Sequence, residues 1–174
     1  MPIPRASAAL TRFTVLDLTR VRAGPTAVRQ LDWETLLPAA EREHYNPAPP
    51  PPVHDYLGEG SLAALQTGSA EVNRELDGLR VKVPGFVVPL ERSADGLLSE
   101  FFLVPYFGAC IHVPPPPPNQ IIYVHMRAGA GLRSIEDAMW VTGTLHAGYK
   151  KSALGSAAYT LDGEKLEPYQ YGKP

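Results

Sequence analysis

The chain has 174 residues, 44% of them hydrophobic, which is enough apolar material for one compact core but hardly for two full domains. Its 16 basic and 18 acidic residues nearly cancel, so no overall field favours a nucleic acid or an anionic membrane as partner. No run approaches the roughly 18 apolar residues of a membrane-spanning helix, and a single cysteine excludes an intramolecular disulfide. We therefore expect one soluble domain.

Residues 1–78 have the composition of an irregular arm. Asp32 is suited to cap a short helical turn that Pro38 ends, and Trp33 supplies an apolar side chain for docking. Further along, Pro49–Pro52 forbid helix and favour polyproline II. We predict that this proline run is extended and exposed, and that Trp33 packs on the domain that follows.

Residues 79–174 change to short strands separated by turn signals. Five strands are predicted, the first bent at its Pro-Gly pair: Arg80–Glu91, Ser99–Phe107, Gln120–Met126, Trp140–His146 and Ala157–Leu161. A short helix is expected over Ser134–Met139, capped by Ser134. This pattern predicts a mainly β fold, a five-stranded OB-like barrel with a short helix between strands 3 and 4, and an open antiparallel α+β sandwich is the alternative. The expected core includes Val81, Val88, Leu103, Val124, Val141 and Leu145.

The only cysteine of the chain follows a strand-like apolar run. Cys110 and His112 are two residues apart, and in extended backbone such side chains point to the same side, about 6 to 7 Å apart. A thiolate and an imidazole suit zinc, copper or iron, but zinc needs three or four protein ligands. His125 and His146, on predicted strands, are candidates for completing the set. The alternative is a buried cysteine beside a histidine that is hydrogen-bonded to backbone.

A run of five prolines follows this pair and offers a different interpretation. If exposed, the stiff rod presents carbonyls to a partner protein at little entropic cost. If docked, it lines the barrel, and the two amides after it close the turn into the next strand. Both interpretations are open for the residues concerned, which are Pro114, Pro115, Pro116, Pro117, Pro118, Asn119 and Gln120.

An enzyme is not expected. His112 could activate Cys110, yet an i, i+2 strand geometry holds the two groups side by side, and the chain has no C-x-x-C, G-x-S-x-G, phosphate-loop or dinucleotide motif. Nucleic-acid binding is also disfavoured, because only scattered basic residues could neutralise phosphates. A stacking platform would have to use the aromatic residues Tyr106, Phe107, Tyr123, Trp140 and Tyr149.

Four segments also point to a family when taken in order: LDWETLLP, VKVPGFVVPLE, FFLVPYFGACIHVPPPPPNQIIYV and VTGTL. They resemble the bacterial family known only as domain of unknown function 3299, over about Leu31 to Tyr169. The resemblance implies export to the periplasm or envelope, and an association of some members with metal-responsive transport systems, especially for zinc. It thus implies a noncatalytic envelope binding or adaptor protein with a protein partner, zinc being the cofactor to test. The alternative is a structural or assembly partner without a metal site.

Overall fold

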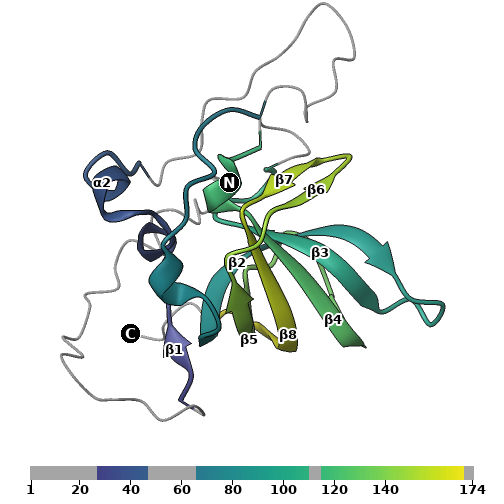
Figure 1. The fold of residues 1–174 in the computed structure, drawn as a ribbon. Coiled ribbons are helices and arrows are strands. Elements are labelled where there is room, and N and C mark those ends of the chain that lie inside the picture. Colours follow the sequence, from purple (N-terminus) through teal and green to yellow (C-terminus); the bar gives the residue numbers. More distant parts are fainter. Residues whose placement is uncertain (1–26, 47–65, 110–114, 171–174) are drawn as a thin grey trace, which may run out of the picture.

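Short apolar strands curl into a closed barrel in the computed structural model, which describes residues 27–46, 66–109 and 115–170. Five strands form the barrel (Figure 1): β2 (Arg80–Arg92), β3 (Leu98–Val104), β4 (Ile122–Ala130), β5 (Met139–His146) and β8 (Tyr159–Pro168). They pair in the order β2-β3-β4-β8-β5, and β5 pairs back with β2. Only the β4–β8 pair is parallel within this barrel. The predicted mainly β, OB-like barrel is confirmed.

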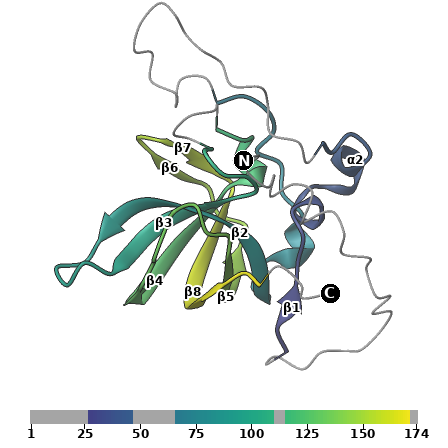
Figure 2. The same ribbon diagram turned by 180° about the vertical axis from the view of Figure 1, so that it is seen from behind.

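Smaller elements surround the barrel. The two-residue strand β1 (Arg29–Gln30) adds to β2 in parallel, and β6 (Lys150–Ser152) and β7 (Gly155–Ala157) form a separate hairpin. Figures 1 and 2 show β1 and the helix α2 on one side of the barrel and the hairpin at another edge. The helical pieces are all short: η1 (Glu34–Leu36), α2 (Ala39–Arg42), η3 (Arg74–Leu76) and η4 (Pro118–Gln120).

The long strand β2 pairs with two neighbouring strands, and it changes from one to the other just after Pro84 and Gly85. Its first half, Arg80 to Gly85, pairs with β5, and its second half pairs with β3. A side chain at Gly85 would lie 2.7 Å from the carbonyl oxygen of Val104, so the close approach of β3 requires glycine here. The bulge or sharp bend was predicted at the Pro-Gly pair, which is where β2 changes its partner strand, whereas the shifts in pairing register lie further along, between Pro89 and Arg92.

Two apolar clusters lie on the two sides of the sheet. All six predicted core residues are buried, five of them in the inner cluster. Val88 belongs to the outer cluster instead, because alternate residues of a strand face opposite sides and Val87 takes the inner position. The outer cluster consists of Phe86, Val88, Phe102, Val104, Tyr106, Ala109, Ile121, Tyr123, Ala138, Ala157 and Tyr169.

The helix expected over Ser134–Met139 is a turn. The Ser134 hydroxyl accepts a hydrogen bond from the Glu136 amide at 3.1 Å, which stabilises a local turn, and six residues are too few to nucleate a helix unaided.

The arm supplies apolar side chains to the inner cluster of the barrel. Trp33, only 3% exposed, packs there and donates from Nε1 to the Pro84 carbonyl at 2.7 Å.

The predicted docking of Trp33 is thereby confirmed, whereas the Pro49–Pro52 run lies outside the described residues. The polypeptide on both sides of that run reaches the inner cluster, through Leu31 and Leu36 before it and Leu76 after it. The arm and the barrel therefore share one core. In the described ranges, no helix has the length and apolar character needed to cross a membrane.

Candidate functional site

The inside of the barrel is filled by side chains. Phe101 and Tyr159 are fully buried, and Leu161 is almost so. A side chain at Gly143 would overlap the carbonyl oxygen of Asp162 on β8, so the strands approach each other as closely as they can. Small barrels of this kind hold no ligand inside, and recognition uses their outer surface.

The usual ligand face of an OB-fold is covered here by the chain itself. That face comprises the second and third barrel strands, here β3 and β4, with the loops that flank it. Phe102 and Tyr123 on this face are buried in the outer cluster, where they meet edge to face with ring centroids 6.2 Å apart. Ala157 and Leu154 of the hairpin pack against the same cluster. An aromatic stacking platform on this face would need the hairpin to move.

Tyr123 interacts with a positively charged group at its ring and a negatively charged group at its hydroxyl. The ammonium group of Lys150 lies 4.8 Å from the centre of its ring, and the Glu100 carboxylate accepts a hydrogen bond from its hydroxyl. Burial raises the pKa of Tyr123, and the hydrogen bond and the charges of Glu100 and Glu91 raise it further. The carboxylates favour a cation at this place and disfavour a phosphate.

A polar row runs across the neighbouring strands on the same outer surface. His125 on β4 is paired in register with Asp162 on β8, and the Nε2 atom of His146 on β5 lies 3.6 Å from the Asp162 carboxylate. The Nδ1 atom of His146 lies 3.8 Å from Asp77, which itself accepts the Ala147 amide at 3.0 Å. We call these four side chains, His125, Asp162, His146 and Asp77, the outer polar row.

The structure thus places His125 and His146 on one face, on either side of Asp162. In the parts of the chain that the structure describes, no three His, Cys, Asp or Glu side chains are arranged to share one metal ion. Cys110 and His112 lie outside the described residues. The two strand-borne histidines consequently do not make a zinc site by themselves.

The described part of the proline block is built into the fold. Pro115 and Pro116 are buried, Pro117 and Pro118 are half-buried, and Pro114 lies outside the described residues. The Gln66 side chain donates to the Pro116 carbonyl at 2.9 Å. This is the geometry that the docked interpretation predicts.

Asn119 and Gln120 connect the barrel to the arm. Asn119 donates to the Glu41 carboxylate at 2.9 Å and to the Glu71 carbonyl at 3.0 Å, and Gln120 donates to the Trp33 carbonyl at 2.9 Å. Both side chains are buried. Gln120 Oε1 is the one buried side-chain polar atom without a hydrogen-bond partner in the described ranges.

Sequence reasoning missed three residues of this region. The outward orientation of Asp162 could have been predicted, because it is the polar member of an alternating strand and such residues face outward. The roles of Gln66 and Lys150 could not, since each acts on a segment far away along the chain. Gln66 holds the hairpin through both backbone groups of one residue, accepting from the Ser156 amide at 2.7 Å and donating to the Ser156 carbonyl at 2.8 Å.

Comparisons with known proteins agree with this architecture. Residues 33–168 match a family model described as "Protein of unknown function (DUF3299)". The chain is also similar to a DUF3299 family protein of Pseudomonas aeruginosa PAO1, known from a crystal structure. That match has a TM-score of 0.73 and 45% sequence identity, and it covers 84% of this chain and 99% of that one. No curated protein matches the chain significantly.

Proposed function

Because the chain belongs to the DUF3299 family of proteins of unknown function, we propose a role from its own geometry: a noncatalytic binding or adaptor protein of the cell envelope. Its protein partner meets the outer surface beside the hairpin. The observation that carries this proposal is the filled barrel interior, which leaves recognition to the outside. The envelope location rests on the family resemblance.

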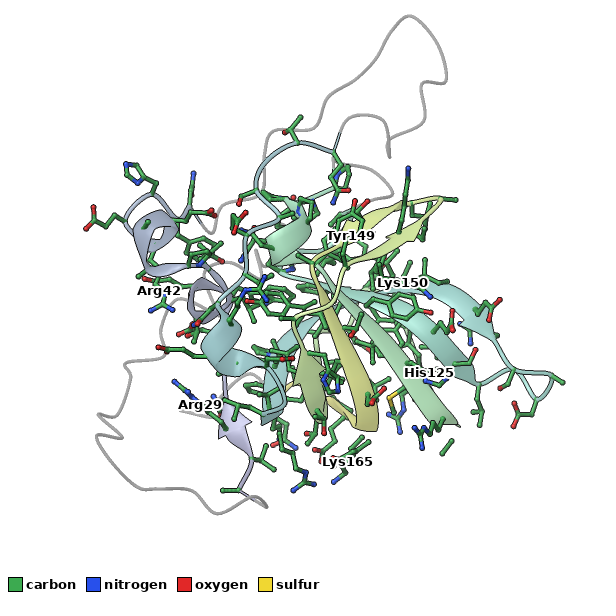
Figure 3. The ribbon with its side chains drawn as sticks, in the orientation of Figure 1. Arg29, Arg42, His125, Tyr149, Lys150 and Lys165 are labelled. Atoms are coloured by element: carbon green, nitrogen blue, oxygen red, sulfur yellow. The ribbon has the colours of Figure 1, made fainter. Side chains whose placement is uncertain are left out.

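The partner-binding surface in this proposal is the outer polar row together with Tyr149. Tyr149 is 63% exposed, more than any other large hydrophobic residue in the described ranges. Figure 3 places Tyr149, Lys150 and His125 on the side of the barrel away from Arg29 and Arg42. Exposed aromatic side chains with a polar rim are typical of the energetic centres of protein interfaces.

The backbone that leads into Tyr149 is anchored at Ala147 and Gly148. The preceding Ala147 amide is bound by Asp77, and a side chain at Gly148 would lie 3.2 Å from the Thr160 hydroxyl, so this turn rests directly on β8. This support ends at Gly148, so it fixes the point from which the exposed aromatic side chain projects.

Photo-crosslinking in the native host tests this proposal. A benzoylphenylalanine at position 149 is expected to give one discrete crosslinked product, and the same residue at position 135 should not, although Ile135 is also exposed. Asp162→Asn should reduce the yield from position 149, because it changes the charge of the polar row. No product from position 149, or equal products from both positions, would contradict the proposal.

Zinc binding is the second part of the proposal, and it depends on Cys110 and His112. Support comes from the donor types, since a thiolate and an imidazole are ligands that zinc prefers. Zinc titration of protein purified without an affinity tag is expected to lose its tight phase in both Cys110→Ser and His112→Ala. If His125 or His146 completes the set, the corresponding alanine variant loses it too. Unchanged affinity in the first two variants would leave the alternative, an assembly partner without a metal.

A further inference from the structure

The hairpin that covers the OB-type ligand face has unequal attachments along its length. Its second strand is anchored within its length and just after it: Gln66 holds the N–H and C=O of Ser156, and the Ala158 amide donates to the Pro118 carbonyl at 2.8 Å. The buried residues of the hairpin begin at Gly155, where this second strand starts. The start of the connection is anchored as well, where Asp77 binds the Ala147 amide.

Between these anchors lies a six-residue segment, Tyr149–Leu154, bounded by Gly148 and Gly155. Gly155 has a φ of 151°, a conformation that favours glycine. Small residues at the ends of a segment often absorb the dihedral changes of hinge motion. The segment is paired with the anchored strand by only three residue pairs, and a two-stranded ribbon of this size has little stability of its own.

Two side chains fasten this segment to the barrel. Lys150 lies over the Tyr123 ring, and Leu154 packs on the outer cluster. The next lysine, Lys151, is exposed, and within the described ranges it lies over no aromatic ring. A cation on an aromatic ring is a modest interaction, so this fastening can be broken without disturbing the closed barrel.

We propose that Tyr149–Leu154 is a hinged flap that opens about Gly148 and Gly155 and uncovers the Tyr123–Phe102 pair. The face beneath it is the position where barrels of this type bind their ligands. Glu100, which accepts a hydrogen bond from the Tyr123 hydroxyl, and Glu91 add negative charge near this tyrosine, and negative charge favours a cation such as the Lys150 ammonium there. Lys150 is thus the charged one of the two side chains that fasten the flap to the barrel.

The test is nitration of the full chain by tetranitromethane, followed by mass spectrometry of the tyrosine peptides. Two tyrosines serve as internal references: Tyr149 is 63% exposed, and Tyr159 is fully buried. In the wild-type protein we expect Tyr123 to react more slowly than Tyr149 and clearly faster than Tyr159.

Lys150→Met should raise the rate at Tyr123 by about threefold to tenfold and leave Tyr159 unchanged. Lys151→Met removes the same charge without touching the ring, and it should change neither rate. Loss of a nearby cation alone makes the reactive phenolate rarer, so the charge change by itself predicts a slower reaction in Lys150→Met, whereas opening predicts a faster one. The proposal is overturned if Tyr123 reacts no faster than Tyr159 in wild type, or if the two lysine variants give the same rates.

Discussion

Tyr159 shows how one side chain can organise two distant segments. Its hydroxyl donates to the Leu36 carbonyl at 2.6 Å and accepts from the Asn73 amide at 2.7 Å, while its ring fills the inner cluster. Burial is the main reason why the pKa of Tyr159 rises to about 12. The folded state therefore favours the neutral phenol, since charging it inside the barrel is unfavourable.

This shift predicts a pH dependence of stability. The unfolded phenol ionises near pH 10, whereas the folded one stays neutral to about 12, so the stabilisation is complete below pH 10 and is lost as the pH rises from 10 to 12. Tyr159→Phe should cost about 1 to 2 kcal/mol at pH 7, because two backbone groups lose a partner. Its stability should then fall less steeply between pH 10 and 12 than that of wild type.

Urea unfolding at several pH values measures both effects. Tyr149→Phe is the matched control, since that side chain is largely exposed, and it should behave like wild type throughout. An alkaline loss of stability as steep in Tyr159→Phe as in wild type would show that this residue is not its source.

At the level of elements, barrel closure depends on how closely β5 approaches β8. Gly143 and Gly163 face each other in register across this pair. A side chain at Gly143 would overlap backbone atoms of Asp162, which cannot yield without moving the strand. At Gly163 the nearest atom is the sulfur of Met126, the far part of a flexible side chain that can turn aside.

These surroundings predict an order of stability for three alanine variants. Gly143→Ala should lower the free energy of unfolding by about 1 to 3 kcal/mol, the usual cost of overpacking a core. Gly163→Ala should cost less, and Gly131→Ala should be close to neutral because nothing lies within 4 Å of its added methyl group. Thermal melts of the three proteins check the order, and a Gly143→Ala protein as stable as Gly131→Ala would refute this account of closure.

For the whole molecule, the main structural fact is that the arm belongs to the barrel core. Leu31, Trp33 and Leu36 are all buried in the inner cluster, and burial of each such side chain contributes about 1.5 to 3 kcal/mol. The sum is comparable with the 5 to 15 kcal/mol that separates a typical domain from its unfolded state. The arm and the barrel should therefore unfold together.

The two tryptophans allow a direct test of this cooperativity. Trp140→Phe leaves Trp33 as the reporter for the arm, and Trp33→Phe leaves Trp140 on β5 as the reporter for the barrel. In each variant, the urea midpoint from fluorescence should coincide with the midpoint from far-UV circular dichroism. An arm signal that changes at lower urea than the dichroism would mean that the arm undocks first.

Much of the barrel follows from local sequence patterns. Alternating apolar residues predicted four of the five strands to within four residues at either end, because strand periodicity acts between near neighbours. The fifth strand was predicted only over its first residues, since it continues to Pro168. The Pro-Gly pair marks the place where β2 changes its partner strand. The docking of Trp33 was predicted as well, since a large apolar side chain beside a helical turn has to be buried somewhere. The four segments that resemble the family could also be recognised in the sequence, because each of them is a contiguous stretch of residues.

Only the tertiary structure decided which distant residues meet. It made Ser134–Met139 a turn, it joined Lys150 to Tyr123 and Gln66 to the hairpin, and it set His146 beside Asp162. The face of each strand residue depends on strand order and register, which are settled when β5 closes back onto β2. Closure joins segments far apart in the chain, so the contacts that build the candidate site exist only once the whole barrel has formed.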